Sequence, residues 1–203
     1  MACRCRRPSS ASACRSTRAP DVAREHAYTF AALREEDLPL ARRWLREPHV
    51  RRWWHDDPEE HDYPEDTLAG WREAIRGEDP TDMFLIRLDG APIGVIQSYR
   101  VDDHPDYVAE LGPLPERAFS LDVLIGEPAL IGQGHGAALI RAFLRGAFER
   151  YGLEYCVIGP SRANAAAVRA CEKVGFRYLK DYREEDTTDP PHALLDLRRR
   201  DLV

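Results

Sequence analysis

The sequence predicts a single domain of the mixed α/β class, a layered sandwich of sheet and helices. Its 203 residues and 43% apolar composition suit one core of ordinary size. Strand-like and helix-like segments follow the order β-α-α-β-β-β-α-β-α-β-β, which is typical of a layered sheet. Asp89-Gly90 between two apolar runs predicts a hairpin, and so antiparallel pairing. No internal repeat divides the chain.

The first third of the fold contains one strand, two helices and an acidic loop. Residues 28–33 alternate as a strand does, and residues 34–46 carry their apolar side chains on one helical face. A second, short helix is expected over residues 49–54. Residues 55–66 hold seven carboxylates and two prolines, which are incompatible with a core element. We therefore expect a loop there.

The middle of the chain contains the clearest hairpin. A helix is expected over residues 67–77, with Asp66 as its N-cap. Residues 82–88 and 91–100 form the two hairpin strands. Residues 101–116 are polar and contain prolines, so we expect an irregular excursion. The remaining elements are, in order, a buried strand at 118–125, a helix at 134–151, a strand at 154–158, a helix at 161–174, and a closing hairpin of 176–183 with 192–198.

The N-terminal segment differs in composition from the rest. Residues 1–26 are rich in Arg, Ser, Ala and Pro and lack hydrophobic periodicity, so we expect disorder there and a domain spanning residues 27–203. Six arginines and one aspartate within residues 1–24 leave a net charge of −11 on residues 25–203. An acidic domain argues against a nucleic-acid partner and suits a cationic ligand.

Cysteine content and apolar runs exclude two further classes of protein. Three of the five cysteines lie in the N-terminal segment, and only Cys156 and Cys171 lie in the domain. This pattern suits neither a disulfide framework nor a metal site. Without a run of membrane-spanning length or a signal-like apolar region, we expect a cytoplasmic protein with no membrane partner.

The stretch Leu121–Gly136 is the strongest functional signal. A strand ends in a loop, and Gly132, Gly134 and Gly136 then open a helix. Glycines spaced in this way let backbone N–H groups turn inward, and the helix adds its unpaired first-turn donors, so the stretch predicts a phosphate-binding loop. The absence of a Lys-Ser/Thr pair argues against a nucleoside triphosphate, and the spacing is not that of the dinucleotide fingerprint. Coenzyme A, another nucleotide, or a loop that serves packing alone remain open from the residues themselves.

Taken together, the motifs are more specific. The sequence resembles the Gcn5-related N-acetyltransferase (GNAT) superfamily and, within it, the aminoglycoside 6′-N-acetyltransferases. The resemblance covers about residues 28–198. The motifs that carry it are Asp122-Val-Leu-Ile-Gly126, Ile131-Gly-Gln-Gly-His-Gly136, Pro160, Asn164 and Glu172-Lys-Val-Gly-Phe176, with Arg52-Trp53-Trp54 and Ile93–Tyr99 nearer the start.

This resemblance implies a GNAT-type central sheet, mixed and mostly antiparallel and flanked by helices, and acetyl-CoA as the co-substrate. It places the pyrophosphate on the backbone of Ile131, Gly132, Gln133, Gly134, His135 and Gly136. It also implies that the main chain of Val123 and Leu124 meets the pantetheine arm and polarises the thioester carbonyl. Asn164 matches a family residue that contacts the arm, and it also suits a helix N-cap.

Asp122 is the residue that the resemblance assigns to the chemistry. A carboxylate at the acceptor end of the site can hold an ammonium group and accept its proton. The alternative is a buried carboxylate that only caps or pairs. Two positions depart from the family pattern: Gly159 stands where an aspartate commonly binds the amino sugar, and Cys171 where a tyrosine commonly protonates the leaving thiolate. A thiol can also donate a proton, although a helix cysteine is more often packing.

The acceptor residues expected from the sequence are Trp53, Trp54, Tyr107, Glu110 and Asp122. They predict a small cationic amine as partner, above all the 6′-amine of an aminoglycoside, with antibiotic resistance as the phenotype. The alternatives are acylation of an N-hydroxylysine-type amine in siderophore assembly, acetylation of a protein amine, and a non-catalytic acyl-CoA-binding module. Either a monomer or a homodimer is compatible with the sequence.

Overall fold

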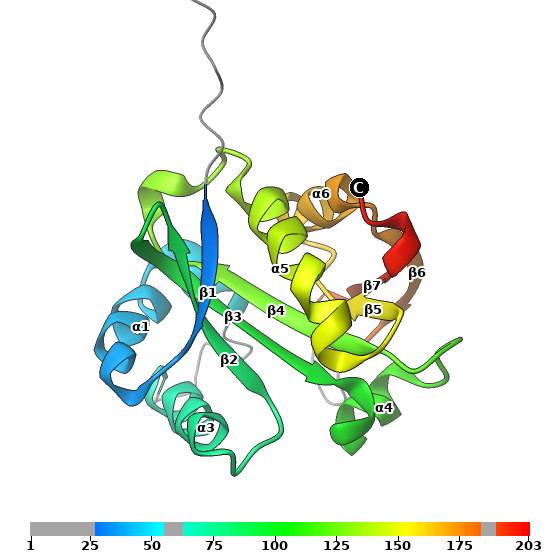
Figure 1. Cartoon of the computed structure of the whole chain (residues 1–203), viewed down its shortest axis with the longest axis horizontal. Helices are drawn as coiled ribbons and strands as arrows, with labels where there is room; N and C mark the ends of the chain where they lie inside the picture. Colours follow the sequence, from blue (N-terminus) through cyan, green and yellow to red (C-terminus); the bar gives the residue numbers. More distant parts are fainter. Residues whose placement is uncertain (1–26, 55–62, 184–189) are drawn as a thin grey trace, which may run out of the picture.

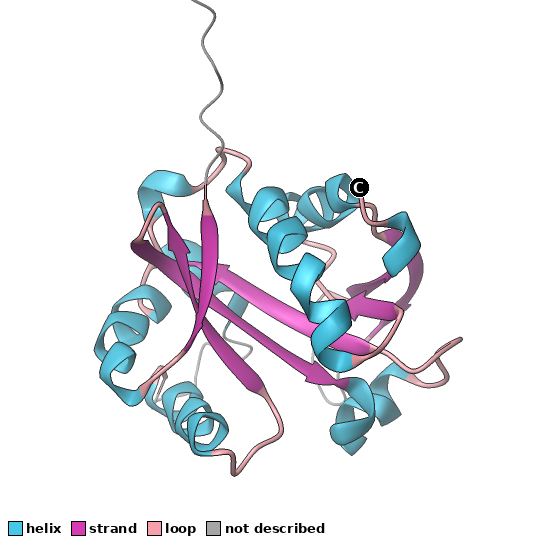
Figure 2. Cartoon of the chain, in the orientation of Figure 1, coloured by secondary structure: helices cyan, strands magenta, loops and turns pink. Residues whose placement is uncertain are grey.

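A seven-stranded sheet in the order β1-β2-β3-β4-β5-β7-β6 forms the centre of the computed structural model, which describes residues 27–54, 63–183 and 190–203. Helices cover both of its faces (Figure 2). The strands are β1 Tyr28–Ala32, β2 Asp82–Leu88, β3 Ala91–Arg100, β4 Phe119–Ile125, β5 Tyr155–Ile158, β6 Arg177–Tyr182 and β7 His192–Arg198. The helices are α1 Leu38–Leu45, α2 Pro48–Trp54, α3 Glu65–Arg76, α4 Pro105–Leu111, α5 His135–Tyr151 and α6 Ala165–Val174.

The expected fold class is confirmed, and the predicted hairpin has the bounds expected for it. Asp89 and Gly90 both adopt positive φ, 49° and 86°, as a tight turn between strands requires. All sheet pairings are antiparallel except that of β4 with β5. The expected N-terminal extension and most of the expected acidic loop lie outside the described residues.

Three local expectations were wrong. Helix α3 begins at Glu65 with Pro64 as its N-cap, so Asp66 lies in the first turn and does not cap it. The excursion at 101–116 contains α4, whose signal in the sequence is faint because Leu111 is its one buried residue. Helix α6 begins at Ala165, after Asn164, because Ser161 instead forms a bridge with His192 of β7.

The apolar side chains form a core on each face of the sheet. Helices α5 and α6 pack on one face, where Phe119 and Leu121 of β4 meet Leu139 and Phe148 of α5. Helices α1 and α3 lie on the other face (Figure 1), where Leu124 of β4 packs with the core that they form. A third cluster lies beneath α4. Since side chains alternate along a strand, each face of β4 serves a different core.

Strand β4 is paired along its whole length on one side only. Seven residue pairs join it to β3, from Gly94 with Ile125 to Arg100 with Phe119. Its parallel pairing with β5 consists of two pairs, Phe119 with Cys156 and Ser120 with Val157. We call the end of this pairing, beyond Ser120 and Val157, the β4–β5 split. It leaves the rest of the β4 backbone edge available to another partner.

The hydrogen bonds at the two ends of the β3–β4 ladder show which residues face the split. The Gly126 amide donates to the Ile93 carbonyl at 2.8 Å, and the Val101 amide donates to the Ala118 carbonyl at 3.0 Å. In an antiparallel ladder, every second residue bonds to the same neighbour. Even-numbered residues of β4 therefore bond to β3. The backbone groups of Val123 face the split.

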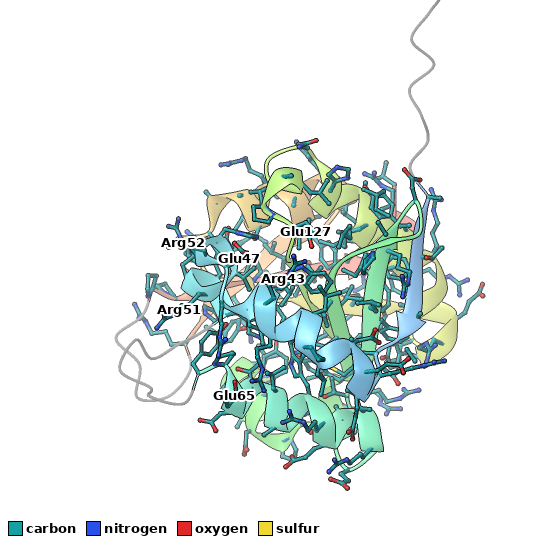
Figure 3. All side chains as sticks on the ribbon, turned by 90° about the vertical axis from the view of Figure 1, so that its left-hand side faces the viewer. Arg43, Glu47, Arg51, Arg52, Glu65 and Glu127 are labelled. Atoms are coloured by element: carbon teal, nitrogen blue, oxygen red, sulfur yellow. The ribbon has the colours of Figure 1, made fainter. Side chains whose placement is uncertain are left out.

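The turn after β4 is held by α1 and α2. Trp44 lies directly on Gly126, where an added Cβ would be 1.9 Å from the indole ring. Trp44 Nε1 and the Arg43 guanidinium both donate to Glu127, at 2.9 and 2.5 Å, and Figure 3 shows Arg43 and Glu127 next to each other. His49 Nε2 donates to the Ile125 carbonyl at 2.9 Å. These contacts fix the end of β4 where the glycine loop begins.

We expect Gly126→Ala to lower the free energy of unfolding by about 1 to 3 kcal/mol, because the new methyl group overlaps the Trp44 indole. Gly146→Ala is the matched control, since Gly146 lies within α5 with nothing within 4 Å of an added Cβ. That change should raise stability by about 0.5 to 1 kcal/mol. Urea unfolding of both variants measures the difference, and equal effects would contradict the contact.

Candidate functional site

The glycine loop has the conformation and exposure of an anion-binding loop. Gly132 and Gly134 adopt φ of 78° and 88°, which residues with a Cβ rarely reach, and nothing lies within 4 Å of an added Cβ at either. Helix α5 starts directly after them, and the Ala138 amide donates back to Gly134 at 3.4 Å. The amides ahead of Ala138 in α5 have no partner within the helix. Together with the positive end of the helix dipole, they suit a diphosphate.

Side chains around the loop hold it in place. The Gln133 carboxamide donates to the Ala129 carbonyl, within the loop itself. His135 is buried, and its Nδ1 lies 2.6 Å from the hydroxyl of Tyr28, which ties β1 to the start of α5. An added Cβ at Gly136 would lie 3.6 Å from Ala170 on α6, an ordinary packing distance. Ile131 and the residues up to Gly134 are exposed, as ligand-binding backbone must be.

The expected donors to the pantetheine arm are placed differently by the strand register. Val123 directs its backbone groups into the β4–β5 split, whereas Leu124 pairs with Val95 of β3. The Val123 backbone is therefore available to a ligand, whereas the Leu124 backbone is already paired with β3. Contact of either residue with the pantetheine arm stays a prediction. Asn164 caps α6, because its side chain accepts a hydrogen bond from the Ala167 amide at 3.1 Å. Whether it also contacts the co-substrate stays a prediction.

Asp122 lies one residue before Val123, and its side chain points to the opposite face of the sheet. Its Oδ2 accepts hydrogen bonds from Gln97 Nε2 at 3.0 Å and from the Tyr99 hydroxyl at 3.3 Å. Burial raises the pKa of this carboxyl, while these two donors and the nearby His192 and His104 oppose the rise. A carboxylate with a raised pKa is a better proton acceptor than an ordinary aspartate.

Aromatic side chains surround Asp122, and of these only Tyr107 was expected at the site from the sequence. Tyr99 packs edge-on against His104 and Tyr107, with ring centroids 4.5 and 5.8 Å apart. Tyr107 packs in the same way on Tyr182, at 6.2 Å. Burial, and next the charge of Asp122, raise the pKa of Tyr99 well above its ordinary value and that of Tyr107 to about 12, so both phenols stay neutral hydrogen-bond donors.

A buried hydroxyl lies within this group. Ser120 is fully buried on β4, two residues before Asp122, and so lies on the same face of the strand. Its Oγ lies near the hydroxyls of Tyr99 and Tyr107, although no partner of ordinary hydrogen-bond geometry satisfies it among the described residues. The site therefore offers hydroxyl groups as well as one carboxylate.

The other expected site residues are scattered. Trp54 packs edge-on against Trp71 of α3 at 6.0 Å, and Trp53 lies beneath the Arg52 guanidinium at 4.4 Å. Glu110 is half-buried on α4, and its charge acts on Tyr107. The structure brings Tyr107 and Asp122 together, whereas the contacts of the two tryptophans are with Trp71 and Arg52. Acceptor binding by Trp53 and Trp54 stays a prediction.

Cys171 belongs to the core between the sheet and α6. It is 1% exposed, and burial raises the pKa of its thiol to about 12. Such a thiol is poorly placed to exchange a proton with a ligand. The placement of Cys171 favours a role in packing, which was the alternative to protonating the leaving thiolate.

Neither a metal site nor a membrane-spanning helix is found in the part of the chain that the structure describes. No group of three or more His, Cys, Asp and Glu side chains there could hold a metal ion. Within the same residues, no helix is long and apolar enough to cross a membrane.

Comparisons with known proteins agree with this geometry. An aminoglycoside N(6′)-acetyltransferase type 1 of Klebsiella pneumoniae is 27% identical over 154 residues, covering 73% of each chain. An N-hydroxyputrescine acetyltransferase of Acinetobacter baumannii is 26% identical over 141 residues, covering 68% of this chain and 64% of the relative. The solved structure of an aminoglycoside acetyltransferase in complex with coenzyme A and kanamycin superposes with a TM-score of 0.71 at 25% identity, covering 86% of this chain and 96% of the other.

A model of the family described as "Acetyltransferase (GNAT) domain" matches residues 34–183. This match runs from just before α1 to just after β6, and so includes the glycine loop, Asp122 and the β4–β5 split. The chain therefore belongs to the GNAT family, as an acetyltransferase that uses acetyl-CoA as its co-substrate.

Proposed function

We propose that this chain acetylates a primary amine of a small cationic acceptor, and that the acceptor is the 6′-amine of an aminoglycoside. The observation that carries the proposal is Asp122, a carboxylate of raised pKa that lies beside the unpaired edge of β4. It meets the requirement of amine acetylation, because an ammonium group must be held and must lose a proton before it attacks a thioester. Resistance to the antibiotic would be the resulting phenotype.

The donor side of the site follows from the backbone. The amides of Gly132 to Gly136 and the first turn of α5 would hold the diphosphate of acetyl-CoA. The Val123 amide, facing the split, would donate to the thioester carbonyl and stabilise the negative charge that develops on its oxygen. Bound acetyl-CoA supplies the activated acetyl group. We assign no proton-donor role to Cys171, because its thiol is buried in the core.

The acceptor side follows from Asp122. Its carboxylate would attract the ammonium, take one proton from nitrogen and leave the amine lone pair free to attack. Gln97 and Tyr99 orient the carboxylate through Oδ2, which leaves Oδ1 to face the acceptor. Since one proton is released for each ammonium acetylated, a carboxyl group whose pKa is raised above that of an ordinary aspartate suits the reaction.

Relatives at about a quarter identity support the acceptor class. Aminoglycoside acetyltransferases recur among both the curated and the solved relatives. The N-hydroxyputrescine acetyltransferase supports a second acceptor, a hydroxylated diamine of the kind expected in siderophore assembly. Both acceptors are amines carried on a small cationic molecule, so the same donor site and the same carboxylate would serve either.

Thiol release from acetyl-CoA tests the proposal directly. The purified chain should release thiol with kanamycin-type sugars that carry a free 6′-amine, and not with the same sugars acetylated at that position. N-hydroxyputrescine, N-hydroxylysine and basic peptides complete the panel. Release with the hydroxylated amines alone would favour the second acceptor, and binding of acetyl-CoA without release for any amine would contradict the proposal.

Asp122→Asn is the variant for the same assay. We expect turnover to fall by about 100-fold or more, because the carboxamide accepts no proton. Its thermal unfolding temperature at pH 7 should not fall. Since burial raises the pKa of Asp122 in the folded state, its charged form destabilises the fold above that pKa, and this penalty is relieved as the pH drops through it. Near-normal turnover in a folded variant would contradict the assignment of Asp122.

Gln97→Leu should move the acid limb of the pH profile of kcat/KM to higher pH. Gln97 donates to the charged carboxylate and thereby lowers its pKa, so its loss raises the pKa of Asp122 further. The base form then appears only at higher pH. Tyr99→Phe removes the longer hydrogen bond and should move the limb in the same direction. A limb that stays in place or moves to lower pH would contradict Asp122 as the titrating base.

A further inference from the structure

The first residue of α5 contacts β1, which is an edge strand of the sheet. His135 follows Gly134 directly and is 7% exposed. Its Nδ1 lies 2.6 Å from the hydroxyl oxygen of Tyr28, and the two rings meet edge-on with centroids 6.2 Å apart. In Figure 1, β1 begins beside the segment that leads into α5. The glycine loop is thus connected to a residue 107 positions earlier in the sequence.

Tyr28 is itself held in place by the hairpin turn and by α5. The Ala27 amide donates to Asp89 Oδ1 at 3.2 Å, and the Asp89 amide donates to the Ala27 carbonyl at 3.0 Å. Two residues further along β1, Phe30 packs edge-on against Phe143 of α5, with ring centroids 5.1 Å apart. Strand β1 therefore meets α5 at two heights, and Tyr28 contacts the start of the helix.

The hydroxyl of Tyr28 suits a lasting contact with an imidazole. Burial, and next the charge of Asp89, raise the pKa of the phenol above its ordinary value, so it keeps its hydrogen near neutral pH. A phenol hydroxyl can donate to the bare Nδ1 of a neutral imidazole, and its oxygen can accept from the N–H of a charged one. The contact with His135 therefore suits both charge states of the imidazole.

The loop before His135 is exposed and is built around two glycines with positive φ. Gly132 and Gly134 have nothing within 4 Å of an added Cβ, and the Gln133 carboxamide bonds within the loop, to the Ala129 carbonyl. Backbone amides bind an anion more tightly when they are already fixed in the arrangement that the anion requires. An anchor at the first residue of α5 restrains the amides on both sides of it.

We propose that Tyr28 is a positioning residue for the co-substrate, which holds the first turn of α5 through His135 so that its amides meet the diphosphate of acetyl-CoA. This inference rests on the proposed diphosphate site and deepens it. Tyr28 acts on the affinity for the co-substrate and not on the transfer of the acetyl group. Its loss therefore affects ligands that carry the diphosphate and spares those that lack it.

Tyr28→Phe removes the hydroxyl and keeps the ring. We expect calorimetry to show about three- to tenfold weaker binding of coenzyme A and of dephospho-coenzyme A, which both carry the diphosphate, as for the loss of one hydrogen bond. The affinity for pantetheine, which carries neither phosphate and is measured by its competition with coenzyme A, should not change. In turnover assays, the KM for acetyl-CoA should rise by a similar factor while kcat stays the same.

Tyr155→Phe is the matched control. Tyr155 also donates from its hydroxyl, to Asp196 Oδ2 at 2.8 Å, but it begins β5, beyond the other end of α5. This variant should leave the affinity for coenzyme A unchanged, even where it lowers the thermal unfolding temperature. A loss of affinity of the same size in both variants would be a general effect of destabilisation and would overturn the inference.

The route through His135 is tested by a double-mutant cycle. His135→Ala should weaken the binding of coenzyme A as Tyr28→Phe does, and the two changes together should weaken it no further. His135→Asn is the conservative variant, because its side-chain oxygen can take the place of Nδ1, and it should retain most of the affinity. Additive effects, or equal losses for coenzyme A and pantetheine in Tyr28→Phe, would overturn the inference.

The underlying proposals fail with different signatures. A wild-type chain that binds pantetheine as tightly as coenzyme A would contradict the diphosphate site, and this inference with it. The expected changes in coenzyme A affinity without thiol release for any amine would contradict the proposed acetylation and support the role of Tyr28.

Discussion

The unequal pairing of β4 is the constraint on which the rest of the site depends. On the β3 side the ladder is complete, and on the β5 side it ends after two residue pairs. A strand in the middle of a sheet normally has no free backbone groups, whereas an unpaired edge is a template for another chain or ligand. Here the free edge is short and is bordered by the glycine loop. The Val123 main chain is thus the group around which a donor arm would extend.

Side chains alternate between the two faces of β4, so the neighbouring residues Val123 and Asp122 point in opposite directions. Val123 has its side chain on the face of α5 and α6, while Asp122 points to the opposite face, with Gln97 and Tyr99 as its partners. In the proposed reaction, Val123 would meet the donor through its backbone edge, and Asp122 would meet the acceptor through its side chain. Trp44 and His49 hold the turn that follows, and so position the glycine loop relative to the end of β4.

The surroundings of Asp122 make its charged form costly for folding but suit a proton acceptor. Burial raises its pKa, and a charged carboxylate there is less favourable than one in water. Two hydrogen bonds and two histidines limit the rise without abolishing it. Functional sites commonly retain such groups because a base poised closer to neutral pH is more effective than an ordinary aspartate.

Local patterns predicted much of this from the sequence. Short runs of consecutive residues predicted the Asp89-Gly90 hairpin, the glycine loop and the helix after it. Asp122 was predicted from the motif that contains it. The side chains around Asp122 were missed because Tyr99, His104, Tyr182 and His192 come from four separate segments and carry no shared motif. The pairing of the Leu124 backbone with β3 was not predicted for a similar reason, since only the register of β3 against β4 decides which amide is free. The contact of Tyr28 with His135 is likewise invisible until β1 and α5 are placed.

Residue-resolved amide hydrogen exchange of β4 tests the central claim most directly. In the free protein the Val123 amide should exchange rapidly and the Leu124 amide slowly, because only the latter is paired with β3. Saturating coenzyme A should protect Val123 and the amides of Gly132 to Gly136, and leave Leu124 unchanged. A Val123 amide that is already protected in the free protein, or a response confined to Leu124, would contradict this account of the split strand.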